Sequence, residues 1–285
     1  MKISLIVNTY NKYISLLILL NSILRQTLKD IEVIIINNSN KNNRLLTKFI
    51  NKAKFNVIVI NDSLPLSVLK NKAIYIASGE YIMFLSNGDY IKSESLEKMY
   101  NSACNHDVVI SRGYKKFLLF RFKNNFSITK ADESEYHDVN INNKLIKKSV
   151  LIDNLFMESP KWENLSNIPV ILSKYKTRVI DNRIFNTKFS IKPIFLHDEN
   201  LLDIIKVLEY LKPQIKAREF KNIAIMEILY RLENYFYSWN RDEEVKYKLK
   251  DYLYLIDNYW FDYEIIKIVM KKDILFRYFI NHAHL

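Results

Sequence analysis

Three short polar segments are candidates for chemistry because each one follows directly on an apolar run. They comprise residues 8–11, 37–40 and 86–89, and Asp89 is the one carboxylate among them. The other side chains are mainly amides and hydroxyls, which can both donate and accept hydrogen bonds. A carboxylate such as Asp89 can instead hold a divalent cation or cap a turn. We therefore treat these three segments as the candidate site.

The elements that position these segments alternate between strand and helix. Apolar runs predict buried strands over residues 3–7, 32–36, 57–60 and 81–85. Apolar residues at helical spacing predict helices over residues 13–26, 43–52 and 66–77, and further along the chain over residues 144–154 and 162–174. This alternation predicts an α/β fold with right-handed crossovers and a mainly parallel sheet. Ligands bind such sheets at the carboxyl ends of the strands, so we expect the three polar segments to share one edge.

The pattern changes beyond about Pro193, where helical periodicity and aromatic residues dominate. We predict an α/β domain over residues 1–190 and a C-terminal helical region over residues 191–285. The last predicted helix, over residues 263–279, mixes apolar residues with lysine and arginine. A basic amphipathic helix of this kind can lie on an anionic membrane surface. We therefore predict peripheral membrane contact through this helix.

Composition places the chain among soluble globular proteins. Of its 285 residues, 49% are hydrophobic and 26% are charged, which excludes intrinsic disorder. A single cysteine, Cys104, excludes a disulfide framework, and no apolar run approaches the ~20 residues that span a bilayer. The first residues lack the features of a signal peptide, so we expect a cytoplasmic protein, peripheral to the membrane if the last helix binds it. The net charge of +12 fits a basic binding surface or codon bias, and we expect no nucleic-acid partner.

Several blocks in a fixed order resemble family 2 glycosyltransferases, which have the GT-A fold. The blocks lie at residues 3–11, 21–36, 66–73, 78–85 and 143–148. The resemblance covers roughly residues 1 to 190. It implies transfer of a sugar, with inversion, from a nucleotide-diphosphate donor to a glycan or lipid-linked acceptor in surface polysaccharide assembly. It also implies Mg²⁺ or Mn²⁺ as the cofactor that bridges the diphosphate.

The resemblance assigns roles to individual residues of this chain. In the family, the turns after the first two strands hold the nucleoside, and a cation usually supplied by arginine lies near the diphosphate. The matching nucleoside positions are Thr9, Tyr10, Asn11, Asn37 and Asn38. Lys70 matches the cation, and lysine offers phosphate a point charge without the forked geometry of arginine.

The chain departs from the family pattern where the family has its metal and base carboxylates. Ser86-Asn87-Gly88-Asp89 replaces the family's Asp-x-Asp-Asp, and Glu163-Asn164 stands where the family has Glu-Asp. Two hypotheses follow. In one, Asn87 and Asp89 hold the cation and Glu163 is the general base. In the other, the chain is a catalytically inactive binding or scaffolding protein on the same fold. Further copies of the chain, or an active partner transferase, are candidate partners.

Overall fold

The computed structural model describes residues 1–9, 13–37, 44–117, 120–123, 141–158, 162–186, 202–221, 223–225, 227–228 and 243–256. These residues belong to two compact units. The first unit comprises residues 1–129 and 138–189, and the second comprises residues 130–137 and 190–285. The domain boundary predicted at residue 190 lies outside the described residues.

The described strands of the first unit form one nine-stranded sheet with the order β3-β2-β1-β4-β8-β6-β9-β5, and β7 pairs with β6. The strands are β1 (Ile3–Thr9), β2 (Ile31–Asn37), β3 (Asn56–Asn61), β4 (Tyr81–Ser86), β5 (Asp89–Ile91), β6 (Val108–Phe117), β7 (Phe120–Lys123), β8 (Lys144–Lys147) and β9 (Thr177–Asn186). Strands β1 to β4 are mutually parallel where they pair, while β8 is antiparallel to both of its neighbours. The predicted α/β fold with its mainly parallel core is confirmed.

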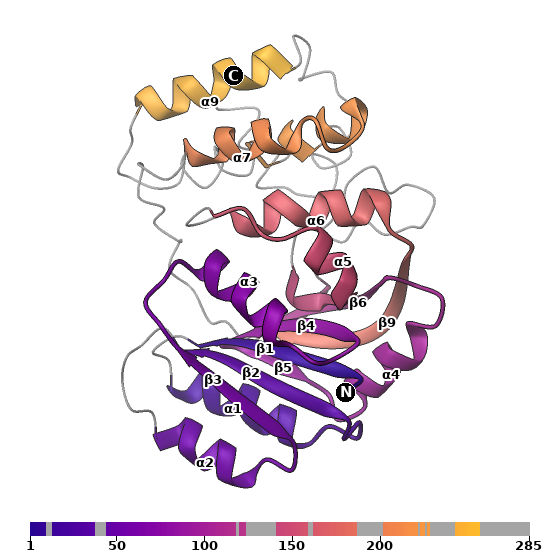
Figure 1. The fold of residues 1–285 in the computed structure, drawn as a ribbon. Coiled ribbons are helices and arrows are strands. Elements are labelled where there is room, and N and C mark those ends of the chain that lie inside the picture. Colours follow the sequence, from indigo (N-terminus) through magenta and orange to yellow (C-terminus); the bar gives the residue numbers. More distant parts are fainter. Residues whose placement is uncertain are drawn as a thin grey trace. The chain divides into compact units, whose positions relative to one another are not determined.

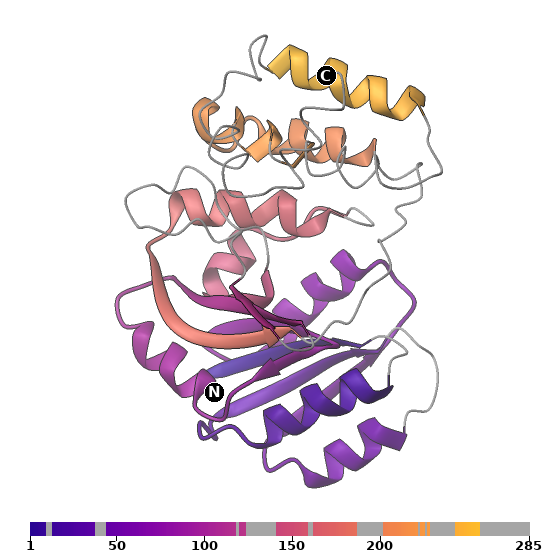
Figure 2. The same ribbon diagram turned by 180° about the vertical axis from the view of Figure 1, so that it is seen from behind.

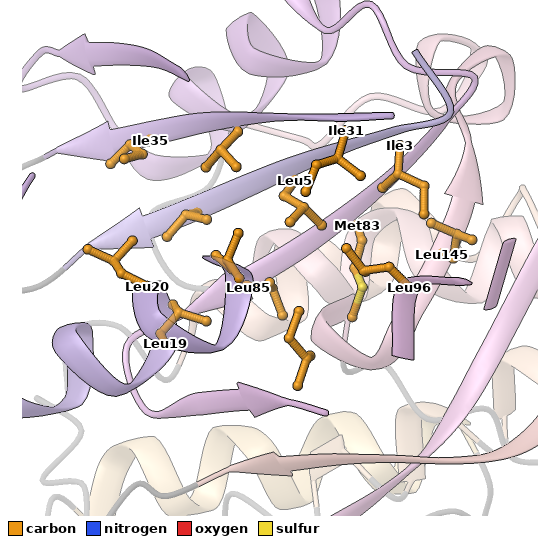
Figure 3. Packing of buried hydrophobic residues seen from close by; sticks show 14 of the residues in the cluster. Ile3, Leu5, Leu19, Leu20, Ile31, Ile35, Met83, Leu85, Leu96 and Leu145 are labelled. Carbon is orange, nitrogen blue, oxygen red and sulfur yellow. The ribbon is translucent and has the colours of Figure 1, made fainter. Parts of the chain in front are cut away.

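Helices cover both faces of this sheet (Figures 1 and 2). They are α1 (Tyr13–Leu24), α2 (Arg44–Lys52), α3 (Leu66–Ile76), α4 (Ser95–Ser102), α5 (Lys148–Asp153) and α6 (Glu163–Lys174). Buried residues of α1, α2 and α4 pack on one face, and those of α3, α5 and α6 pack on the other. Figure 3 shows the first of these cores, where Leu19 and Leu20 of α1 lie over Leu5, Ile35 and Leu85. Because both faces are covered, the parallel strands are continuous apolar runs rather than alternating ones.

The sequence prediction was wrong at residues 144–147. We predicted one helix over residues 144–154, but Lys144–Lys147 form strand β8 and only Lys148–Asp153 form helix α5. Strand β8 lies between β4 and β6, where its backbone groups complete the ladders of both neighbours. This tertiary pairing outweighs the local helical pattern, because an unpaired buried backbone group is costly.

A buried carboxylate joins three elements at the amino edge of the sheet. Glu32 Oε1 accepts hydrogen bonds from Ser4 Oγ at 2.5 Å and from the Ser78 backbone N–H at 2.6 Å. Ser4 Oγ in turn accepts the Gly79 N–H at 2.8 Å. Burial acts to raise the pKa of Glu32, but the bonds from Ser4, Ser78 and Gly79 together hold this pKa below its ordinary value. We call these four residues the amino-edge clamp.

The described part of the second unit is helical. It contains α7 (Asp203–Leu211), α9 (Glu243–Ile256) and helical residues at 217–221, 223–225 and 227–228. Tyr252 of α9 donates a hydrogen bond to Glu209 of α7, and burial together with this bond raises the pKa of Tyr252. The predicted helical character of the C-terminal region is confirmed for these residues. The basic helix predicted over residues 263–279 lies outside them. Among the helices that the structure describes, none is both long and apolar enough to cross a membrane.

Candidate functional site

The carboxyl ends of β1 to β4 form one edge of the sheet, which we call the carboxyl rim and define by Asn8, Thr9, Asn37, Asn61 and Ser86. The strand register places Thr9 beside Asn37, and Asn37 beside Asn61. It also places Asn8 beside Ser86. All three polar segments identified in the sequence therefore have residues at this one edge, where α/β sheets bind their ligands.

A row of neutral side chains crosses the rim. Thr9 Oγ1 donates to the backbone carbonyl of Ile36 at 3.2 Å and lies 3.4 Å from Asn37 Oδ1. The Asn37 amide then donates to Asn61 Oδ1 at 2.9 Å. Thr9 and Asn37 are both buried, so their side chains are held in place. This row can donate and accept hydrogen bonds without any net charge.

Two of the five residues predicted to bind the nucleoside, Thr9 and Asn37, are therefore in contact with each other. The other three, Tyr10, Asn11 and Asn38, lie outside the described residues. Asn61 is an addition that the sequence analysis missed. Its position at the end of the third strand, in register with Asn37, is the signal that could have identified it.

Asp89 closes the turn after β4. Its Oδ2 atom accepts hydrogen bonds from the Ser86 N–H at 2.7 Å and the Ser86 hydroxyl at 3.3 Å. The side chain of Asn142, which precedes β8, donates to the same oxygen at 2.9 Å and to Ser86 Oγ at 2.6 Å. Gly88 within the turn has φ 93°, a backbone conformation that residues with a Cβ rarely adopt. Asp89 is 1% exposed, so one of its oxygens is committed to organising the turn.

Lys70 places a positive charge beside the first turn of α6. Its Nζ donates to Asn164 Oδ1 at 3.1 Å. The ammonium lies 4.9 Å from the ring centroid of Phe156 and 5.8 Å from that of Phe84, so two aromatic faces stabilise it. Asn164 directly follows Glu163, the first residue of α6, whose side chain lies outside the description. A buried lysine and the amino end of a helix both favour an anion.

The comparisons with known proteins agree with this geometry. The family model described as glycosyl transferase family 2 matches residues 4–159. The chain belongs to this family. It is 32% identical over 126 residues to the cholesterol galactosyltransferase of Borreliella burgdorferi, which covers 43% of this chain and 35% of that protein. It is 35% identical over 123 residues to the poly(ribitol-phosphate) beta-glucosyltransferase of Bacillus spizizenii, which covers 41% of this chain and 19% of that protein. These matches thus span well under half of either relative.

Solved structures show the same fold. S. aureus TarS residues 1–349 in complex with UDP has a TM-score of 0.62 and 19% identity, over 78% of this chain and 69% of that one. The complex of TarS with UDP-GlcNAc has a TM-score of 0.63 and 18% identity, over 83% and 73%. At such low identity the likeness establishes the fold alone. The GT-A fold predicted from the sequence is confirmed.

The described residues do not fit a divalent cation at the turn after β4. Magnesium and manganese sites need several oxygen ligands, usually including carboxylates. At this turn Asp89 is the one carboxylate, its Oδ2 already accepts three hydrogen bonds, and Gly88 offers no side chain. Within the described ranges no three histidine, cysteine, aspartate or glutamate side chains gather as a metal site. Coordination by Asn87 and Asp89 therefore stays a prediction, and no chemical step is assigned to a metal below.

Proposed function

We propose that this chain transfers a sugar from a nucleotide-diphosphate donor to a glycan or lipid-linked acceptor, with inversion at the anomeric carbon. The observation that carries the proposal is the buried Lys70 of α3, which contacts the first turn of α6 through Asn164, on the fold of a family 2 member. One relative is named for cholesterol and another for poly(ribitol phosphate), which supports a lipid or polymer as the class of acceptor. A glycosylated lipid or polymer is a building block of a surface glycan, so we place the reaction in surface-glycan assembly.

The nucleoside would bind at the neutral row of the rim. Asn37 and Thr9 present amide and hydroxyl groups there, and Tyr10, Asn11 and Asn38 follow them in the sequence. A pyrimidine base offers both a donor and acceptors along one edge, which amides match without a charge. The TarS complexes with UDP and UDP-GlcNAc support a uridine nucleotide as the donor.

The diphosphate would bind beside Lys70. When the bond between the anomeric carbon and the diphosphate oxygen breaks, negative charge grows on the departing nucleotide. The Lys70 ammonium and the amino end of α6 stabilise that charge. Glu163 then takes the proton from the acceptor hydroxyl as its oxygen attacks the anomeric carbon from the opposite side. The products are the glycosylated acceptor, the nucleotide diphosphate and a protonated Glu163 that returns its proton to solvent.

Calorimetric titration of the full chain with UDP-glucose, UDP-galactose and UDP-GlcNAc tests donor binding. We expect Lys70→Gln to weaken donor binding about tenfold or more, because a charge-assisted bond to phosphate is lost, while Lys70→Arg retains most of the affinity. Lys72→Gln is the matched control, since this lysine of the same helix is exposed and paired with Asp62. Absence of binding to uridine, guanosine and cytidine donors alike would refute the proposal.

Release of the nucleotide in the presence of acceptor tests turnover. We expect Glu163→Gln to slow transfer by about two to four orders of magnitude, the usual contribution of a general base, and to leave donor affinity unchanged. If this variant transfers sugar at the rate of the original chain, the base is another residue. If the original chain binds the donor but neither transfers nor hydrolyses it, the chain is a binding protein on this fold.

A further inference from the structure

Helices α1 and α2 lie together on one face of the sheet of the first unit (Figures 1 and 2). Their inner side chains, such as Leu16 and Phe49, pack into the core below them. Their outer side chains form what we call the α1–α2 surface. It consists of Tyr13, Ile14, Ile18, Asn21, Arg44, Thr47, Lys48, Ile50, Asn51 and Lys52.

The α1 part of this surface is apolar where a surface helix is ordinarily charged. None of the twelve residues of α1 carries a charge. Ile14 is 72% exposed, Tyr13 is 59% exposed and Ile18 is 36% exposed. Ile14 and Ile18 lie on consecutive turns, so they form one patch at the amino-terminal half of the helix. Exposing such side chains to water is unfavourable, and covering them with an apolar medium lowers the free energy.

The α2 part of this surface carries one sign of charge. Arg44, Lys48 and Lys52 are exposed on consecutive turns, and neither α1 nor α2 contains an aspartate or glutamate. Among ion pairs between described residues, none includes these three cations. Helix α4 differs, because there Lys98 pairs with Glu94 at 2.6 Å and Glu97 adds a further carboxylate.

We propose that the α1–α2 surface docks the protein on an anionic lipid bilayer. Exposed isoleucines beside a tyrosine can enter the interfacial region of the bilayer, while lysine and arginine on the neighbouring helix approach the acidic headgroups. A nucleic acid would match the cations alone and would leave Ile14 and Ile18 in water. The inference goes beyond the proposed sugar transfer and does not require it.

The position of the surface also relates it to the carboxyl rim. Thr9 ends β1 and Tyr13 begins α1, so only three residues of chain separate the rim from the apolar patch. The four Cα-to-Cα steps from Thr9 to Tyr13 span about 14 Å at most. Docking through α1 therefore holds the rim close to the plane of the headgroups.

Flotation of the full chain with lipid vesicles tests the proposal. We expect binding to vesicles of phosphatidylcholine with phosphatidylglycerol, weak binding to phosphatidylcholine alone, and a decline of binding as salt screens the charges. The double variant Tyr13→Ser/Ile14→Ser should lower partitioning about tenfold or more, because two apolar side chains no longer enter the bilayer. Its matched control is Tyr75→Ser/Ile76→Ser, the same two residue types exposed on α3 at the opposite face of the sheet. The control should bind as the original chain does.

A second variant keeps the test decisive if the first one folds poorly. Lys48→Glu/Lys52→Glu lies entirely on exposed positions, and each charge removed near an anionic surface should weaken binding roughly fivefold. The proposal is overturned if the original chain ignores the acidic lipid, or if the α1 variant and its α3 control bind equally. It is also overturned if the α1 variant turns a dimer into a monomer without changing vesicle binding, since the surface would then join two copies. The affinity of the same variants for the donor should be unchanged. A failure of the membrane-docking proposal can therefore be distinguished from a failure of the proposed sugar transfer.

Discussion

Two buried carboxylates stand at opposite edges of the same sheet, Glu32 at the amino edge and Asp89 at the carboxyl rim. Each is 1% exposed, and each has one oxygen that accepts several hydrogen bonds. The partners differ in reach. Glu32 joins β1, β2 and the turn before β4, whereas Asp89 mainly closes its own turn and adds one bond from Asn142. The contacts of a buried carboxylate thus show whether it connects distant segments, as Glu32 does, or chiefly stabilises one turn, as Asp89 does.

Each carboxylate also has a neighbouring glycine, for a different physical reason. A Cβ on Gly79 would lie 2.5 Å from the Ser4 backbone nitrogen and 2.8 Å from the Ile3 carbonyl carbon. Gly88 instead has φ 93°. The first glycine allows two backbones to touch, and the second allows a turn conformation. The comparison therefore predicts a graded set of effects on stability.

The largest effect is expected from Gly79→Ala. The added methyl group meets backbone atoms that cannot move away without shifting β1, so the free energy of unfolding should fall by about 3 kcal/mol or more. Gly88→Ala should cost only about 1 kcal/mol, because it strains one residue of a turn. Urea unfolding of both variants gives the two values. Equal losses would show that the amino-edge clamp is no more important to the fold than the turn after β4.

Glu32→Gln is expected to lower the free energy of unfolding by about 2 kcal/mol. The amide still accepts a hydrogen bond, but bonds to a charged acceptor are worth roughly 1.5–3 kcal/mol and weaken when the charge is removed. Asp89→Asn should cost less, since the two bonds from Ser86 lie within one turn. Chemical denaturation measures the pair. A larger loss for Asp89→Asn would reverse the ranking of the two edges.

The pH dependence of stability sharpens the same contrast. The folded-state pKa of Glu32 lies below its ordinary value of about 4.5. The unfolded chain therefore takes up the proton first as the pH falls, and the contribution of Glu32 to stability, complete above about 4.5, is lost toward the lower folded pKa. We expect thermal unfolding of Glu32→Gln to depend less on pH than that of the original chain as the pH falls below the ordinary glutamate pKa of about 4.5. Parallel curves for the two proteins would contradict this assignment.

Much of the first unit was predictable from the sequence because β1, β2 and β4 are buried along their whole length. Continuous apolar runs marked β1 to β4, and helical spacing marked α1 to α3. Strand β8 was not predictable, since four residues with a Lys-Leu-Ile-Lys pattern fit a helix as well as a strand. The choice depends on β4 and β6, which are distant in sequence.

The candidate site shows the same division. Asn37 and Lys70 were singled out because Asn37 directly follows one ordered block of residues and Lys70 lies within another. Asn142 was missed because it is 53 residues away from Asp89, and no local pattern marks it as the partner of that carboxylate. The role of Asp89 in its turn was likewise one of two readings of the sequence, and the hydrogen bonds from Ser86 give that reading its physical basis.

The smallest effect is expected from removing divalent metal, a change that should strongly weaken donor binding in a family member with the usual metal carboxylates. If the turn after β4 holds no cation, removing divalent metal with EDTA should change the affinity for a UDP-sugar less than about twofold, because the diphosphate then relies on Lys70 and the amino end of α6. Calorimetry in EDTA, Mg²⁺ and Mn²⁺ measures this directly. A loss of binding in EDTA that Mn²⁺ restores would place metal ligands in parts of the chain outside the described residues, with Asp89 joining them through its second oxygen. Asp89→Ala would then separate the two cases, since it should abolish the effect of Mn²⁺ only if that carboxylate binds the metal.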